Sequence, residues 1–206
     1  MVVRTNTNTN TVDQSIQVLN LDRIVMVYLL KLDHATLAHC QRTREISLLI
    51  GKRMGLNSNE LQLLGLGALL HDIGKSCIPL AILTKRTPVS STEWELIQTH
   101  PQEGYRYIEA ADLDDIVKQI VLGHHRWANG RGGYPLDPDQ SQPSLFTQIV
   151  TVADVVDAIT SQRPYRPALN VEYCIAYLEQ HLNTLFNREI VSVFKSIKSL
   201  HTFENN

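Results

Sequence analysis

Seven histidine and aspartate positions between residues 39 and 154 constrain the fold more than any other feature of this sequence. Each lies beside turn residues or near an expected helix end, where its side chain can face a shared cleft. The set comprises His39, His71, Asp72, His100, His124, His125 and Asp154. Imidazole nitrogens and carboxylate oxygens in this number suit two transition-metal ions better than one. If they converge, we expect a hydrolytic enzyme.

The composition excludes several classes of protein. The 206 residues carry a formal net charge of −2, so no overall basic field attracts a DNA or RNA polymer or an anionic membrane. The cysteines Cys40, Cys77 and Cys174 form no CxxC pair, which disfavours a disulfide framework and favours a reducing compartment. No apolar run has the length of a membrane span, and the first residues lack a secretory signal pattern. We therefore expect a cytoplasmic protein.

The chain is expected to form one domain preceded by a tail. Residues 1–12 contain the polar repeat TNTNTN, which has little packing potential and predicts a disordered segment. Residues 13–206 have enough apolar side chains for an ordinary globular core. Nothing in the sequence demands a second domain.

Helical periodicity and cap signals organise most of that domain. The pattern predicts helices over residues 15–32, 34–55, 58–70, 91–100, 112–125, 171–185 and 187–200. Gly55 is expected at a C-cap, and Asn57 or Ser58 is expected to cap the next helix, with Glu60 completing a capping box. Ser90 and Glu93 form a second capping box. Because Pro101 follows His100, we expect a helix to end at that histidine.

The remaining segments complete an all-α prediction. Residues 126–143 are rich in glycine and proline, which predicts a long irregular loop of functional importance. The segment SLFTQIVTVADVVDAIT has the valines and isoleucines of a strand, but its length and its aspartates three apart favour a helix. Since no convincing strand pair is present, we expect a helical bundle.

The sequence HDIGK suggests how such a site would work. Asp72 ends a buried apolar helix, and its two carboxylate oxygens can bridge two ions. Two ions lower the pKa of a bound water enough to give hydroxide near neutral pH. Lys75 places a cation nearby that can hold a phosphate oxygen.

Four blocks in this order resemble the HD-GYP family of phosphohydrolases, a subgroup of the HD superfamily whose domain is all-helical. The blocks are HDIGKSCIPLAIL, STEWELIQTHP, HHRWANGRGGYP and VADVVDAITSQRPYRPAL. The likeness covers roughly residues 20–200 and is strongest over residues 36–170. Members of this bacterial family hydrolyse cyclic di-GMP to the linear dinucleotide and in some cases to GMP. The resemblance thus implies a binuclear phosphodiesterase that uses a metal-bridging hydroxide.

The resemblance also implies a ligand set. Around one ion it places His39, His71, Asp72 and Asp154, and around the second His100, His124 and His125, with Asp72 bridging. Iron or manganese is the usual occupant. Some relatives bind a third ion through a glutamate one helical turn before the first histidine. Ala35 stands at that position here, which favours two ions.

Further residues are implicated in substrate binding and catalysis by the same resemblance. Asp72 and Lys75 are expected to be catalytic, and Lys75 also to hold substrate. Gly133, Tyr134 and Pro135 occupy the place of the GYP signature. Arg163 and Arg166 resemble phosphate-gripping positions, although the sequence alone would make them solvated loop charges. Asp157 is expected to support a ligand by hydrogen bonding rather than to bind metal.

Three departures from the family pattern leave alternatives open. Arg126 stands where a glutamate usually follows the histidine doublet, Gln148 replaces a basic residue, and residues 126–129 differ in detail. These changes put substrate fit and rate in question rather than metal binding. One alternative is a degenerate member that binds nucleotide or a protein partner without turnover. Another is an HD phosphohydrolase of a different nucleotide. A regulatory protein or a second copy of the chain remain open as partners.

Overall fold

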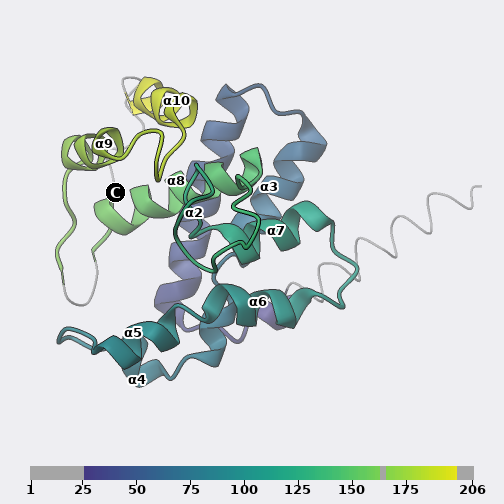
Figure 1. The fold of residues 1–206 in the computed structure, drawn as a ribbon, viewed down its shortest axis with the longest axis vertical. Helices are drawn as coiled ribbons and strands as arrows, with labels where there is room; N and C mark the ends of the chain where they lie inside the picture. Colours follow the sequence, from purple (N-terminus) through teal and green to yellow (C-terminus); the bar gives the residue numbers. More distant parts are fainter. Residues whose placement is uncertain (1–25, 163–165, 199–206) are drawn as a thin grey trace, which may run out of the picture.

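The computed structural model describes residues 26–162 and 166–198, and within these ranges the fold is helical (Figure 1). Isolated β-bridges, among them Arg126 with Gly133 and Leu182 with Phe186, occur in the loops of the described part. The elements are α2 (His34–Arg53), α3 (Ser58–Leu70), η1 (Ile73–Cys77), α4 (Leu80–Leu83), α5 (Ser91–Ile97), α6 (His100–Ile108), α7 (Asp115–Gly123), α8 (Leu145–Thr160), α9 (Val171–Gln180) and α10 (Arg188–Lys198). The all-α prediction is confirmed.

Local cap chemistry sets several helix boundaries as the sequence predicts. The Asn57 side chain accepts from the backbone N–H groups of Asn59 and Glu60, and Glu60 completes the capping box of α3. The Ser90–Glu93 box begins α5 in the same way. Gly55, just after α2, has a φ of +83°, a left-handed conformation that favours glycine. The ambiguous segment after Ser144 is the helix α8.

Two hydrophobic clusters flank the point where α3 ends. The larger lies among α2, α3, α8, α9 and α10 and includes the fully buried Ile50, Leu64 and Phe194. The smaller joins the end of α3 to η1, α6 and α7. Figure 1 shows α9 and α10 at one end of the molecule and α4 and α5 at the other. The doublet His71-Asp72 stands between Leu70 and Ile73, which are both fully buried in the smaller cluster, so packing on each side fixes its backbone.

A close backbone approach brings η1 against α6. A Cβ added to Gly74 would lie 1.9 Å from the carbonyl oxygen of His100 and 2.5 Å from the backbone nitrogen of Gly104. Any larger residue at position 74 would separate these two backbones. The glycine of HDIGK therefore permits the contact that places Asp72 beside His100.

Several sequence predictions about helix boundaries are wrong. His100 does not end a helix but begins α6, because Pro101 needs no N–H partner in the first turn of a helix. The turns Ile73–Cys77 and Leu80–Leu83 are helical without a predicted pattern, and residues 181–185 lie beyond the end of α9.

Two predictions fall on residues outside the described ranges. The disordered tail at residues 1–12 lies outside them entirely, and so does most of the first predicted helix. Of that helix, residues 26–32 are described; residues 26–29 are helical and residues 30–32 are not. Within the described part, none of the helices combines the length and the apolar character needed to cross a bilayer.

Candidate metal centre

All seven histidine and aspartate residues converge in the folded chain. The potential ligand atoms of His39, His71 and Asp154 lie within 4.8 Å of one another and form what we call the His39 group. Those of Asp72, His100, His124 and His125 also lie within 4.8 Å of one another. We call the three histidines of this second set the His100 group. The predicted convergence is thus present, and it divides the residues into two neighbouring sets.

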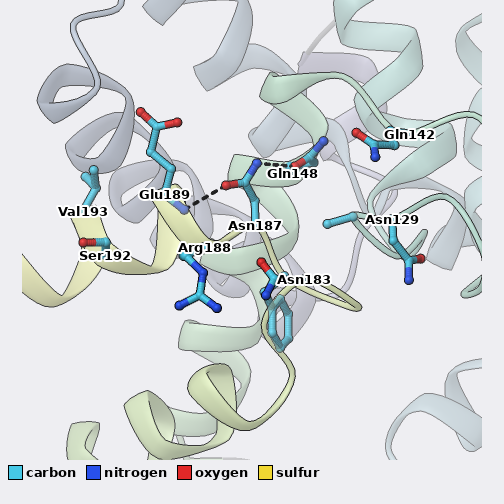
Figure 2. Close-up of a pocket in the computed structure, with 11 residues that line it drawn as sticks. Asn129, Gln142, Gln148, Asn183, Asn187, Arg188, Glu189, Ser192 and Val193 are labelled. Atoms are coloured by element: carbon cyan, nitrogen blue, oxygen red, sulfur yellow. Dashed lines mark hydrogen bonds between the residues drawn. The ribbon is translucent and has the colours of Figure 1, made fainter.

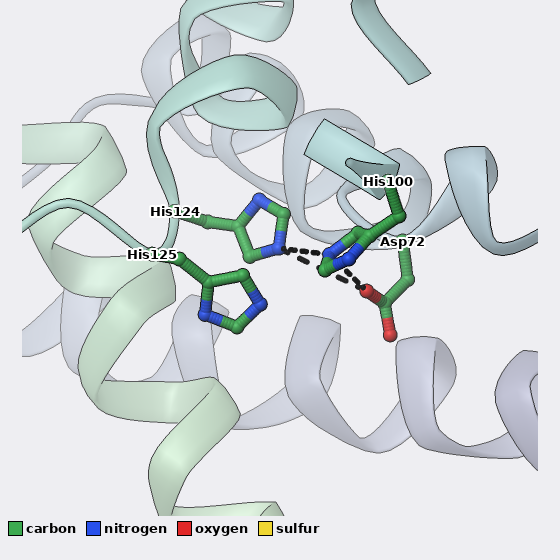
Figure 3. A group of neighbouring side chains, drawn as sticks. All are labelled: Asp72, His100, His124 and His125. Atoms are coloured by element: carbon green, nitrogen blue, oxygen red, sulfur yellow. Dashed lines mark hydrogen bonds and ion pairs between the residues drawn. The ribbon is translucent and has the colours of Figure 1, made fainter. Parts of the chain in front are cut away.

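Asp72 joins the two groups through its separate oxygens. Oδ2 lies 3.7 Å from His39 Nε2 and 3.5 Å from His71 Nε2. Oδ1 lies 3.2 Å from His100 Nε2 and 3.8 Å from His124 Nε2 (Figure 3). One carboxylate oxygen therefore faces each group, which is the arrangement a bridging ligand requires.

Backbone carbonyls orient three of the histidines. Nδ1 of His71 lies 2.7 Å from the carbonyl oxygen of Ala68, and Nδ1 of His100 lies 2.7 Å from that of Ile97. His124 makes the same contact with Val121 at 3.0 Å. Because a carbonyl only accepts, Nδ1 carries the proton in each neutral ring and Nε2 keeps its lone pair. Each Nε2 is thus available as a metal ligand.

Several nitrogen and oxygen lone pairs inside the cluster have no hydrogen-bond donor in the described part of the chain. Nε2 of His100 and Nε2 of His124 lie 3.1 Å apart, and two neutral rings with protonated Nδ1 atoms cannot donate to each other there (Figure 3). Within the described residues, His71 Nε2 and Asp72 Oδ1 are buried without any hydrogen-bond donor or acceptor. Unsatisfied buried polar atoms are costly. Cations between these atoms would satisfy them, so the residues present fit a two-ion site.

His39 is oriented by a carboxylate from a distant part of the chain. Its Nδ1 donates to Asp157 Oδ2 at 2.5 Å, while Nε2 lies 3.0 Å from Asp154 Oδ1. Asp157 in turn accepts from Arg42 Nε at 2.5 Å and from the Ser161 hydroxyl at 2.8 Å. Burial lowers the pKa of His39, but the two aspartates outweigh it and raise the pKa. Asp157 therefore has the supporting geometry predicted for it.

Burial and charge keep the side chains in forms that bind cations. Burial lowers the pKa of His71, places that of His124 well below its ordinary value and brings that of His125 to about 3. Although burial alone would raise the pKa of Asp72 and Asp154, neighbouring Lys75 and histidines hold both well below the usual range. Neutral imidazoles and ionised carboxylates are the forms that metals require.

Lys75 and Cys40 lie beside the cluster with different consequences. The Lys75 ammonium lies 2.5 Å from Asp72 Oδ2, and Asp72 and Asp154 raise its pKa despite burial. It is therefore a fixed cation next to the Asp72 carboxylate. Cys40 is fully buried near His71 and Asp72, and burial raises the pKa of its thiol well above the ordinary value. A protonated thiol is a poor ligand, so we interpret Cys40 as a packed residue.

The Gly133-Tyr134-Pro135 segment folds back onto the His100 group. A Cβ on Gly133, whose φ is +83°, would lie 2.1 Å from the carbonyl oxygen of His125. The Tyr134 ring lies 4.6 Å from the His125 ring and 6.2 Å from the His100 ring, and Pro135 follows through a cis peptide bond. Burial and nearby carboxylates raise the pKa of Tyr134, so its hydroxyl keeps its proton. The loop thus presents a protonated hydroxyl and an aromatic ring at the cluster.

Residues 25–190 match the family of HD domains. The chain belongs to this HD domain family. Its sequence is 30% identical over 165 residues to 3'3'-cGAMP-specific phosphodiesterase 3 of Vibrio cholerae, covering 80% of this chain and 36% of the relative. It is 32% identical over 161 residues to the cyclic di-GMP phosphodiesterase response regulator RpfG of Xanthomonas campestris, covering 77% of this chain and 42% of the relative. The predicted HD-GYP resemblance is confirmed, and the chain spans less than half the length of these two relatives.

Solved structures agree on the fold of this HD domain. An HDG"Y"P protein from Bdellovibrio bacteriovorus superimposes with a TM-score of 0.63 at 21% identity, covering 78% of this chain and 51% of that one. The HD domain of the L. monocytogenes phosphodiesterase PgpH, in complex with cyclic-di-AMP, gives a TM-score of 0.59 at 14% identity, covering 89% and 99%. At these identities the likeness supports the fold alone.

The departures from the family pattern lie in the loop and at its ends. Arg126 donates through Nη2 to Asp137 Oδ2 and to the Ser141 carbonyl oxygen, both at 2.6 Å. Its charge is therefore paired within the loop. Gln148 donates to the Pro143 carbonyl oxygen at 2.7 Å and accepts from Asn187 at 2.9 Å, so it ties the loop to the start of α10.

A separate hollow of about 620 Å³ lies beyond that tie, between the loop and α10 (Figure 2). Its lining includes amide side chains, among them Asn129, Gln142 and Asn183, and none of the seven cluster residues. The hollow is therefore distinct from the candidate metal centre of the HD domain.

The two predicted phosphate-binding arginines are not both observable. Arg163 lies outside the described residues. The Arg166 guanidinium donates to the carbonyl oxygens of Ala158 and Ile159 at 2.5 and 3.3 Å, at the end of α8. It thus caps α8, the helix that carries Asp154. Within the described part of the chain, it makes no contact with the seven cluster residues. The supporting role of Arg42 was missed by sequence reasoning, because its partner Asp157 is distant in sequence and no local pattern connects them.

Proposed function

We propose that this HD domain is a metal-dependent phosphodiesterase that hydrolyses cyclic di-GMP to the linear dinucleotide, GMP or both. The relatives named above act on cyclic di-GMP or 3'3'-cGAMP, so the substrate class is a cyclic purine dinucleotide. The single observation that carries the proposal is Asp72, whose two oxygens each face a different group of histidine nitrogens.

Two divalent transition-metal ions, iron or manganese, are the proposed occupants. The ions would supply a hydroxide nucleophile near neutral pH and stabilise the charge that develops on the phosphate. His39, His71 and Asp154 would hold one ion, His100, His124 and His125 the other, and Asp72 both. No side chain is then needed as a nucleophile.

The chain's own residues would position and stabilise the substrate. Lys75 neutralises Asp72 and offers its remaining N–H donors to a phosphate oxygen. The protonated Tyr134 hydroxyl can donate to the same phosphate. Gly133 allows the loop backbone to lie close to the backbone of His125. In this proposal Pro135 fixes the exit of the loop and Arg163 binds phosphate. Arg166 would bind phosphate only after its guanidinium leaves the carbonyl oxygens of Ala158 and Ile159. Preorganised donors of this kind stabilise developing negative charge.

Hydrolysis assays with protein loaded anaerobically with ferrous iron or manganese test the proposal. We expect turnover of cyclic di-GMP, or of 3'3'-cGAMP in a substrate panel, and its loss in Asp72→Ala. The matched control is Asp112→Asn, which changes an exposed carboxylate that makes no side-chain hydrogen bond to the described residues. Wild-type turnover surviving in the Asp72→Ala protein would contradict the mechanism.

The degenerate-member alternative gives a different outcome in the same assay. It predicts two bound ions and nucleotide binding without turnover. Its motivation was the positive charge of Arg126 beside the metals, but that charge is paired with Asp137 and held by the Ser141 carbonyl. This pairing favours the enzyme. A regulatory partner or a homodimer stays a prediction.

A further inference from the structure

Trp94 extends the aromatic surface of the candidate site outward. It lies on α5, and its side chain is 46% exposed. The indole ring meets the Tyr134 ring edge-on, with centroids 6.3 Å apart and an interplanar angle of 81°. Tyr134 in turn contacts the rings of His125 and His100. A row of rings therefore leads from the His100 group to an accessible indole.

Trp127 shows that exposure alone does not single out Trp94. Trp127 is 38% exposed, but its ring lies against the loop backbone, since a Cβ on Gly132 would come within 2.4 Å of the indole. Its backbone N–H also bonds the Gly132 carbonyl at 3.0 Å. No ring partner is recorded for Trp127 among the described residues, whereas Trp94 adjoins Tyr134. Trp127 therefore packs against its own loop, whereas Trp94 lies beside the candidate site.

Local contacts fix the backbone segment that carries Trp94 before any ligand binds. The Ser90 capping box starts α5, and Glu93 of that box also accepts from Lys85 Nζ at 2.8 and 2.6 Å. α5 is followed within three residues by His100, whose Nδ1 donates to the α5 carbonyl of Ile97. The segment that carries Trp94 is therefore fixed to a metal-binding histidine. An aromatic ring with little freedom to lose makes an effective stacking platform.

We propose that Trp94 stacks on one purine base of the cyclic dinucleotide whose phosphate lies at the metal centre. This inference rests on the proposed function and adds the residue that recognises the base. A nucleotide places its base one sugar away from its phosphate. The indole of Trp94 is likewise separated from the His100 group by one ring, that of Tyr134. Stacking on an aromatic side chain tolerates any base but strengthens with the size of its π surface, so it favours purines.

Kinetics of tryptophan variants give the first test. We expect Trp94→Ala to raise KM for cyclic di-GMP roughly ten-fold or more, as loss of a stacked base does, with kcat nearly unchanged. Trp94→Phe should restore most of the affinity, which a purely structural defect would not predict. Metal content should equal that of the wild type in both. Trp127→Phe should leave KM and kcat unchanged. An unchanged KM in a folded, metal-loaded Trp94→Ala protein would overturn the stacking role.

Fluorescence gives a second test that does not remove Trp94. The chain has two tryptophans, so Trp127→Phe leaves Trp94 as the sole indole emitter. A hydrolysis-resistant phosphorothioate analogue of cyclic di-GMP should quench this emission. The Trp127 emission of Trp94→Phe should not respond to the same analogue. Equal responses in the two proteins, or none in Trp127→Phe, would contradict the proposal.

The two tests separate this inference from the proposed function. Hydrolysis by the wild type without any effect at Trp94 removes the stacking role and leaves the phosphodiesterase intact. Quenching at Trp94 without hydrolysis keeps the base-binding role and supports the degenerate-member alternative. Absence of both hydrolysis and quenching overturns both proposals.

Discussion

The two ligand groups of the candidate metal centre are held by different means. In the His100 group, His100 and His124 lie at helix ends and donate to carbonyl oxygens three residues earlier in their own segments. In the His39 group, His71 is held in the same local way by the Ala68 carbonyl, but His39 lies within α2 and depends on Asp157 of α8. Arg42 of α2 holds Asp157 in turn. The first arrangement follows from local backbone geometry, while the second requires two helices to be packed together. Changes remote from the ligands should therefore affect the His39 group more.

The largest effects should come from single-ligand variants that separate the groups. We expect His39→Ala and His100→Ala each to abolish hydrolysis and to reduce the metal content from two ions per chain to one. The reason is that each removes a ligand from a different group while Asp72 remains for the other. Metal analysis of purified, reloaded protein checks this. Loss of both ions in either variant would show that the two groups do not bind independently.

A smaller effect is expected from the carboxylate that supports His39. Asp157→Asn should weaken metal affinity at the His39 group by roughly 10- to 100-fold, as changes to the partners of metal-binding histidines commonly do. The His100 group should keep its affinity, because His100 and His124 are held by backbone carbonyls and not by Asp157. Competition with a chromogenic chelator measures the two affinities. Equal weakening of both groups would remove the distinction drawn above, and Asp112→Asn serves as the carboxylate control.

A third variant tests the loop that covers the His100 group. Gly133→Ala should lower the free energy of unfolding by roughly 1–3 kcal/mol because of its left-handed backbone. It should also impair hydrolysis, since the new methyl group would collide with the His125 carbonyl. Gly55→Ala is the matched control: its φ is the same +83°, but a Cβ there meets nothing within 4 Å. Thermal unfolding and hydrolysis of both variants should show shared destabilisation and an activity loss confined to Gly133→Ala.

The smallest effect is expected at Arg126. Removing a partly exposed ion pair typically costs about 1 kcal/mol or less, so Arg126→Ala should barely change the unfolding temperature. Hydrolysis should persist, because the guanidinium binds Asp137 and the Ser141 carbonyl instead of a metal ligand. A large gain in activity would instead identify Arg126 as the inhibitory substitution. Steady-state rates of the two proteins under equal metal loading decide between these outcomes.

The sequence was sufficient where the determining interaction is local. The capping boxes at Asn57 and Ser90 and the left-handed Gly55 follow from residues a few positions apart, so they were predicted correctly. His100 was placed at the wrong end of a helix because a proline at the next position is compatible with both a break and a first turn. The helical turn η1 was missed since it depends on the close approach of Gly74 to α6.

The candidate site shows the same division. The seven residues of the cluster were found from their types, their turn context and a family resemblance, but their separation into two groups required the fold. Arg42 and Trp94 carry no signal of their own. The first acts through a carboxylate more than a hundred positions away, and the second is an exposed aromatic on a short helix. Both become informative only once α2, α5 and α8 are in place.

The most direct test of the account is a metal titration of the wild type and Asp72→Ala proteins, with cyclic di-GMP hydrolysis measured on the same samples. The account predicts two ions per wild-type chain, with turnover that rises as the second ion binds. In Asp72→Ala, both metal affinities should fall and turnover should be lost. Full turnover with a single ion, or an Asp72→Ala protein that keeps two tightly bound ions and its activity, would contradict the bridging role of Asp72.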